Sequence, residues 1–271
     1  MLRGGVVGRG PAGEVTEMSG RTGGANCLEA NDWVCGEYLR TRSQELLDAT
    51  VQHLGITAVS VALGLLLAFP LALVARSRRG AAGPVLGLTT VLYTIPSLAM
   101  FALLTPVFGV SAAVVVTGLV LYSLTILVRN ILAGLQAVPA GVREAARGMG
   151  YGPVRLLFGV ELPLAIPALV AGLRIATVST VAMTTVGSVV GYGGLGNLIA
   201  SGMAGFFKAE VLTASVLCVL LALVADVLLM VLQRLLTPWT RAGARPGVWG
   251  RAAARARGRT RAAKAWAERW E

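Results

Sequence analysis

The sequence predicts an all-α polytopic membrane protein with about five transmembrane helices. Of its 271 residues 55% are hydrophobic and 14% are charged, whereas a soluble domain carries about 25% charged residues. The apolar runs reach about 20 residues or more, enough at about 1.5 Å per residue to cross a hydrocarbon core of about 30 Å. These runs must be helices, because lipid leaves backbone N–H and C=O groups without partners and barrel strands are shorter.

Five apolar runs have the required length and define the expected spans. They cover residues 49–75, 85–108, 112–132, 164–190 and 211–236. We therefore divide the chain into an N-terminal segment (1–48), a membrane domain (49–236) and a basic tail (237–271). The N-terminal segment contains no apolar stretch of the signal-peptide type, so we do not expect a cleavable leader.

The basic residues alternate from loop to loop. The first 48 residues hold five arginines against seven acids, and the loop between the second and third runs carries no charge. Arginines gather in the tail and in the loops after the first and third runs, where they are Arg76, Arg78, Arg79, Arg143, Arg147 and Arg155. By the positive-inside rule these segments face the cytoplasm and the N-terminus lies outside. The net charge of +11 thus reflects topology and does not indicate nucleic-acid binding. The tail is either solvated or lies on anionic lipid.

The N-terminal segment is expected to be extracytoplasmic, with a disordered first part. Residues 1–36 are rich in glycine and polar residues, and helical character begins only near Asp32. Cys27 and Cys35 fall on the outer side, where a disulfide can form, but the sequence leaves their pairing open. Cys218 lies within a span, and we interpret it as a small packing residue.

The loop after the third run, "EAARGMGYGPVRLLFGVELP" (144–163), contains charged residues and glycines that are unfavourable in a membrane span. Helical spacing places four apolar residues on one face of a short helix: Val142, Ala145, Ala146 and Met149. Gly150 can supply the left-handed residue that ends this helix. A second short helix is expected from Pro153 to about residues 162–163. The small alanine side chains would let a partner approach the first helix closely.

The same loop resembles the EAA loop of ABC-transporter permeases. The matching positions are Glu144, Ala145, Ala146, Gly150, Val160, Leu162 and Pro163, with valine at 160 where the family pattern has isoleucine. In that family the loop forms the helix that seats in a cleft of the ATP-hydrolysing subunit. The resemblance implies a cytoplasmic coupling loop, in which Gly150 and Pro163 set the geometry and Glu144 makes a polar contact with the ATPase.

Further segments are similar to permeases of the glycine betaine, carnitine and choline class. They are residues 37–74, 92–109, 127–139 and 191–199, and the likeness as a whole covers about residues 33–240. This resemblance implies the transport subunit of an importer for osmoprotectants with a quaternary ammonium group. Permeases for methionine share the loop and a glycine-rich segment after the same span, so methionine or another small solute is the alternative substrate.

The resemblance also implies partners. We expect two ABC ATPase subunits, a second permease subunit that is identical or different, an extracytoplasmic solute-binding protein and membrane lipid. The chain itself has no G-x-x-x-x-G-K-[ST] motif, and neither Lys208 nor Lys264 follows a glycine. ATP and Mg are therefore expected on the partner ATPase, with no cofactor and no enzyme activity in this chain.

A glycine-rich segment, "GYGGLG", fits the dinucleotide fingerprint G-x-G-x-x-G. That fingerprint needs a preceding strand and a βαβ unit, whereas here it follows a membrane helix. We expect a flexible or re-entrant loop on the outer side, near the mouth of the pathway or a binding-protein contact, made by Gly191, Gly193, Gly194 and Gly196. A plain turn is the alternative.

Two groups of residues within the spans are candidates for a role inside the bundle. Arg174 and Asp226 each lie about ten residues from the cytoplasmic end of a span, at a depth of about 15 Å, so we expect an ion pair. The candidates for lining a pathway are Tyr93, Pro96, Tyr122 and Asn130, because a quaternary ammonium favours aromatic faces. Tyr93 and Pro96 can equally serve packing and a kink.

A membrane-embedded hydrolase or transferase is the rival from another class. Acid–base chemistry needs positioned titratable groups, and the spans hold almost none. His53 is the only histidine and has no cysteine or paired carboxylate at a metal-ligand spacing, so no metal site is expected. Ser188, in "GSVVG", lacks the context of a nucleophile elbow. This rival and a non-transporting scaffold are both disfavoured.

Overall fold

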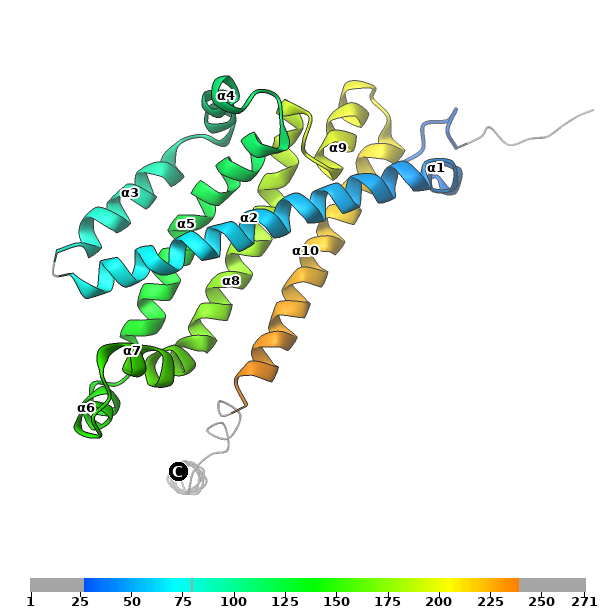
Figure 1. The fold of residues 1–271 in the computed structure, drawn as a ribbon. Coiled ribbons are helices and arrows are strands. Elements are labelled where there is room, and N and C mark those ends of the chain that lie inside the picture. The colour runs from blue at the N-terminus through cyan, green and yellow to red at the C-terminus, as the bar shows by residue number, and fades with distance from the viewer. Residues whose placement is uncertain (1–26, 79, 239–271) are drawn as a thin grey trace, which may run out of the picture.

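The computed structural model describes residues 27–78 and 80–238, and the regular elements within them are all helical (Figure 1). The expected disorder at the start of the chain and the basic tail concern residues 1–26 and 239–271, which lie outside the described residues. In the described part, four helices are long and apolar enough to cross a membrane, and one bent pair can supply a fifth crossing. The prediction of an all-α membrane protein with about five spans is confirmed.

The long helices form a bundle around α5 (Ala112–Gln136). The helix α2 (Ser43–Ser77) crosses the bundle diagonally, and α8 (Leu162–Thr184) packs between α5 and α10 (Lys208–Leu236) (Figure 1). The core between α2, α5 and α8 is apolar and contains Ala68, Ala72, Leu127, Val128, Ile131, Leu135, Ala165 and Ala176. Most of α10 instead leaves its apolar side chains exposed, as expected for a helix that faces lipid or another subunit.

Small residues bring the central helices into close contact. A Cβ atom at Gly64 of α2 would lie 2.2 Å from Ser123 Oγ of α5, and one at Gly172 of α8 would lie 2.3 Å from Asn130 Cβ of α5. Helices in lipid gain nothing from apolar burial against each other, so they associate through such close packing.

The second predicted span, 85–108, is not one straight helix. It divides into α3 (Ala82–Thr94) and α4 (Ser97–Phe108), which meet at 96°. Pro96 causes the break: it disfavours helical geometry at the preceding residue, and Ile95 is extended, with φ −66° and ψ 126°. The broken pair leaves polar backbone in the middle of an apolar stretch, which is tolerated where it lies inside protein or lines a cavity.

The fourth predicted span, 164–190, is the centre of a longer irregular helix. The helix begins at α7 (Pro153–Leu156), passes through a π turn, η1 (Leu157–Glu161), continues as α8 and ends in a 3-10 turn, η2 (Thr185–Val190). The predicted start at Pro153 is confirmed. The predicted stop near residues 162–163 is wrong, because the chain widens into the π turn there and stays helical.

Proline explains the wide turn. In a regular α-helix the ring of Pro163 would meet the carbonyl of Gly159, four residues earlier, and Pro163 has no N–H to donate to it. The N–H of Leu162 donates instead to the carbonyl of Leu157, five residues back. The turn therefore absorbs the proline without ending the helix.

The segment that precedes α2 is folded against the turn between α9 (Leu195–Ala204) and α10. A disulfide joins Cys27 to Cys35, ahead of α1 (Gly36–Thr41). The Asn31 amide donates to the Phe206 carbonyl (2.8 Å) and accepts from the Lys208 N–H (2.9 Å). This segment is thus hydrogen-bonded to the hairpin of α9 and α10. The expectation of an unstructured chain up to residue 36 is wrong from Cys27 onward.

Candidate functional site

The coupling loop predicted from the sequence forms α6 (Ala140–Gly148), at one end of the bundle (Figure 1). Of the predicted apolar face only Ala146 is buried, whereas Val142, Ala145 and Met149 are exposed. Glu144 is exposed as well. The chain itself therefore leaves most of this helix open, with small and apolar side chains available to another protein.

Gly150 ends α6 in the way its spacing predicts. Its φ is +84°, in the left-handed region that favours glycine. The N–H of Gly150 donates to the Arg147 carbonyl (2.9 Å) and the N–H of Tyr151 to the Ala146 carbonyl (3.1 Å). These two bonds form a Schellman motif, which closes the last turn of a helix and fixes the direction of the chain that follows.

The second half of the loop returns into the membrane domain through α7 and η1. Val160, Leu162 and Pro163 are half-buried in this turn, where α7 leads into α8. The residue between them, Glu161, is buried and forms an ion pair with Arg76 in the last turn of α2. The local sequence does not predict this pair, because Arg76 follows the first span whereas Glu161 lies in the loop after the third.

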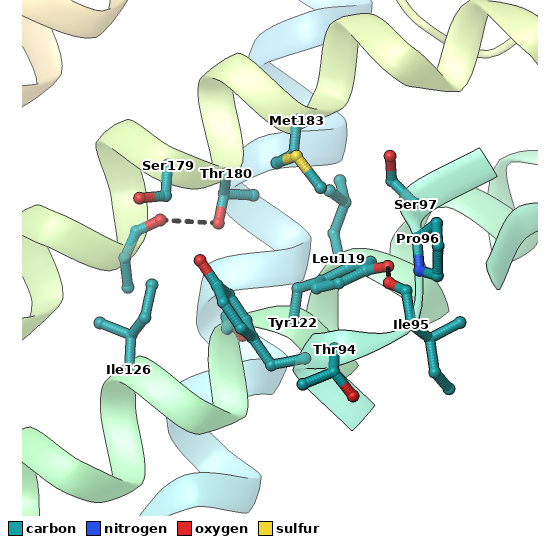
Figure 2. Close-up of a pocket in the computed structure, with 13 residues that line it drawn as sticks. Thr94, Ile95, Pro96, Ser97, Leu119, Tyr122, Ile126, Ser179, Thr180 and Met183 are labelled. Carbon is teal, nitrogen blue, oxygen red and sulfur yellow. Dashed lines mark hydrogen bonds between the residues drawn. The ribbon is translucent and has the colours of Figure 1, made fainter. Parts of the chain in front are cut away.

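A cavity of about 290 Å³ opens where the second span is broken. The break between α3 and α4 forms one wall, and α5 and α8 form the other, with Ser179, Thr180 and Met183 facing Pro96 and Ser97 across the space (Figure 2). No charged residue lines the cavity. Its volume is at the lower end of the range for ligand pockets, about 300 to 1,000 Å³.

Two tyrosines give the cavity an aromatic wall. The rings of Tyr93 and Tyr122 meet edge to face, with centroids 5.9 Å apart. The Tyr122 hydroxyl donates to the Ile95 carbonyl, which the helix break leaves without a helical partner (Figure 2). Three of the four pathway candidates, Tyr93, Pro96 and Tyr122, thus line one cavity. Asn130 does not: its amide donates to the Ile126 carbonyl (2.8 Å) and its Cβ packs on Gly172.

The glycine-rich segment forms a closely packed turn at the end of the bundle opposite α6 (Figure 1). Gly191 and Gly194 have positive φ, at +76° and +55°. The side chain of Asn197 accepts from the Gly193 N–H (3.0 Å) and donates to the Gly191 carbonyl (2.9 Å). A Cβ at Gly196 would lie 2.2 Å from the Thr185 carbonyl oxygen. The expected flexible loop is therefore a tightly held one.

His53 of α2 contacts both this turn and the helix bundle. The side chain is fully buried, with Nε2 3.0 Å from the Val181 carbonyl oxygen and Nδ1 3.2 Å from the Gly193 carbonyl oxygen. A Cβ at Gly194 would lie 2.6 Å from His53 Cβ, so a glycine is needed there for the turn to reach α2. In the sequence His53 stands alone, because its partners are more than a hundred positions away.

Arg174 and Asp226 are brought together between α8 and α10. The Arg174 Nε lies 2.8 Å from Asp226 Oδ1, and Nη2 lies 2.8 Å from Oδ2, which is a two-point contact. Both side chains stay partly exposed on the flank of the bundle. The pair lets two charged groups lie within membrane helices, because each is the counter-charge of the other.

Comparison with known proteins places this arrangement in a family. The family model described as "Binding-protein-dependent transport system inner membrane component" matches residues 53–242. This chain belongs to that family. The osmoprotectant import permease protein OsmW of Salmonella typhimurium is 37% identical over 206 residues, which cover 74% of this chain and 96% of that protein. The choline transport system permease protein OpuBB of Bacillus subtilis is 35% identical over 202 residues, with coverage of 74% and 93%.

Solved structures of the family's fold agree with this assignment. A chain of the MetNI methionine ABC transporter in inward-facing conformations superimposes with a TM-score of 0.65 at 23% identity, covering 73% of this chain and 98% of that one. An amino acid ABC transporter solved with histidines gives a TM-score of 0.64 at 20% identity. At these identities the likeness shows the fold alone. The chain is thus an inner-membrane transport component and a multi-pass membrane protein.

Proposed function

We propose that this chain is the membrane-spanning permease subunit of an ABC importer for quaternary-ammonium osmoprotectants such as glycine betaine, choline and carnitine. The observation that carries the proposal is the 37% identity to an osmoprotectant permease over 96% of its length. The glycine betaine, carnitine and choline permease OpuCB of Bacillus subtilis, 33% identical over 201 residues, supports the same class.

The chemistry of the cavity supports a quaternary ammonium solute. Such a cation has no N–H to donate, so it is recognised by aromatic faces rather than by hydrogen-bond acceptors. Tyr93 and Tyr122 offer those faces, and the hydroxyls of Ser97 and Ser179 offer contacts for a carboxylate or hydroxyl at the other end of the solute. A methionine zwitterion would bring an ammonium group with three donors, for which an uncharged aromatic wall is a poor match.

Energy for transport would come from other polypeptides. Two ABC ATPase subunits would hold ATP and Mg, and α6, with Glu144, Ala145 and Ala146, would seat in one of them. A second permease subunit would complete the pathway, and a solute-binding protein would deliver the solute at the opposite face. The chain itself would hold no nucleotide and no cofactor, and would carry out no hydrolysis.

This assignment orients the chain in the bacterial cell membrane. The coupling loop and the tail (237–271) would face the cytoplasm, and residues 1–48 would lie outside. The disulfide between Cys27 and Cys35 supports this orientation, because disulfides persist on the oxidising side of the membrane. The basic residues around α6 agree with it through the positive-inside rule.

Reconstitution tests the proposal. The chain would be purified with its ATPase and binding protein, placed in liposomes and supplied with ATP. Uptake of radiolabelled glycine betaine or choline is expected, and a complex without ATP serves as the control. Uptake of methionine with none of either quaternary compound would overturn the assignment of the solute.

A further inference from the structure

Glu161 is an unusual residue for its position, because a carboxylate is buried at the edge of an apolar helix. Its side chain is only 2% exposed, and its partner in the structure is Arg76. A buried charge needs a counter-charge, since desolvation without one is costly. The contact therefore ties the end of the coupling loop to the last turn of α2.

The π turn sets the direction of this carboxylate. Glu161 is the last residue of η1, and the extra residue in a wide turn rotates the chain after it relative to the chain before it. Each residue of an α-helix turns the side-chain direction by about 100°, so a regular turn would direct Glu161 elsewhere. The proline at 163, through the turn it causes, thus positions Glu161 against α2.

The helix α2 is also held at its other end. His53 contacts the carbonyls of Val181 in α8 and Gly193 in the glycine turn. Arg76 and His53 are separated by roughly 35 Å of helix at about 1.5 Å per residue. One continuous helix therefore contacts the coupling loop at one end of the bundle and the glycine turn at the other.

An open groove lies between α2 and the loop, and Arg76 and Glu161 are both in its wall. The groove measures about 810 Å³, and both polar and apolar residues line it: Arg76, Ser77, Arg147, Tyr151 and Glu161, with Leu73, Val74, Pro153, Val154, Leu156 and Leu157. Arg147 and Tyr151 belong to the loop, whereas Arg76 and Ser77 belong to α2. The ion pair is the charged contact between the described residues of the two elements there, beside apolar residues of both.

We propose that the Arg76–Glu161 pair makes α2 move together with the coupling loop. A displacement of α6 would reach the glycine turn through α8, with which the loop is continuous, and through α2, whose last turn the pair links directly to the loop in addition to the apolar core that α2 shares with α5 and α8. Arg76 and Glu161 are then positioning residues for coupling and touch neither the solute nor ATP. The inference rests on the proposed ATP-driven transport function.

Spin-label distances test this movement without reference to any solute. The labels would be attached to two introduced cysteines, Val59→Cys in α2 and Val154→Cys in α7, both at exposed positions. The background would be Cys218→Ser, so that the native free cysteine is not labelled. In the assembled transporter the distance between them should stay the same with and without trapped ATP. With Arg76→Met, which keeps the aliphatic stem, the distance should shift or broaden when ATP binds.

Transport provides the second readout. In the Arg76→Met complex the solute carried per ATP hydrolysed should fall at least about fivefold, while ATP hydrolysis continues. The double variant Arg76→Glu with Glu161→Arg should restore both the distance and the ratio. Arg42→Met is the matched control, because it removes the exposed pair with Glu45 near the opposite end of the same helix and should change neither readout.

The outcomes separate the inference from the proposed function. An unchanged distance and ratio in Arg76→Met would overturn the role of the pair, as would a distance in the parent that changes with ATP. Glu161→Gln, which keeps the shape of the side chain, gives the same test if Arg76→Met does not assemble. The complex could also show the expected distances and yet transport no quaternary ammonium solute. That result would overturn the proposed substrate class and would leave the role of the ion pair supported.

Discussion

Two glycines illustrate how single residues decide the backbone path for different reasons. Gly194 has both a positive φ and a neighbour, His53, that a Cβ would meet at 2.6 Å. Gly150 has open space around it and is constrained only by its φ of +84°. A side chain at Gly194 would therefore displace the turn, whereas one at Gly150 would bend the end of α6 without a collision.

The Gly150→Val variant tests the geometry of the coupling loop. The left-handed conformation costs a residue with a Cβ about 1–2 kcal/mol, and a β-branched side chain adds to this. Membrane insertion and complex assembly should persist, whereas solute carried per ATP hydrolysed should fall at least about fivefold. Gly152→Val is the matched control, because Gly152 has φ −72° and open space. Normal coupling in Gly150→Val would contradict the role of this turn.

The aromatic wall predicts the effect of Tyr93→Leu. Loss of one ring should weaken binding of choline to the permease–ATPase complex by about 2- to 30-fold, because a cation–π contact contributes about 0.5–2 kcal/mol. The affinity would be measured by equilibrium binding without the solute-binding protein. Tyr93→Phe keeps the ring and should bind choline nearly as well as the parent. Equal affinities in both variants would argue against a solute contact at Tyr93.

Among the elements, the broken second span and the irregular fourth helix show how proline shapes this protein. Pro96 ends α3 and frees the Ile95 carbonyl, which the Tyr122 hydroxyl then satisfies. Pro163 produces a π turn that keeps the helix continuous. Both features shape the surroundings of the candidate sites: the first borders the cavity, and the second places Glu161 against α2.

An ion pair within the membrane contributes to the contact between α8 and α10. Arg174→Ala or Asp226→Ala leaves a charge without its counter-charge, so each should lower the yield and the thermal midpoint of the purified complex. The exchange Arg174→Asp with Asp226→Arg should recover much of both, as read by size-exclusion chromatography and a thermal scan. Failure of the exchange to recover either quantity would mean that the pair is not what joins these helices.

The whole molecule has two functional ends joined by long helices. The coupling loop lies at one end, and the glycine turn, α9 and the disulfide-closed segment lie at the other (Figure 1). In the segment near α9, burial and nearby Glu210 raise the pKa of Tyr38 to about 12, and its ring meets that of Phe207 edge to face.

Labelling of intact cells tests the orientation of these two ends. In a Cys218→Ser background, Phe206→Cys should react with a membrane-impermeant maleimide, because Phe206 is 83% exposed and would lie outside in the proposed orientation. Met149→Cys, 71% exposed at the coupling loop, should react only after the cells are opened. Labelling of Met149→Cys from outside would rule out contact with a cytoplasmic ATPase.

Much of this architecture follows from local sequence. The apolar runs predict the spans because length and hydropathy decide whether a segment crosses a membrane. The spacing of Glu144, Gly150 and Pro163 predicts α6 and its left-handed end, because caps and prolines act within a few residues. The family resemblance depends on the same short-range pattern.

Apart from the Arg174–Asp226 pair, which the depth of the two residues predicts, tertiary structure decided which distant residues meet. The pairs Arg76 with Glu161, His53 with Gly193, and Tyr122 with Ile95 join segments far apart in the chain, and nothing in their local sequence indicates the partner. From the sequence, Pro96 likewise predicts a kink, and only the packing of the helices shows that the break borders a cavity. The physical reason is that a buried polar group must find a partner, and helix packing determines which one lies within reach.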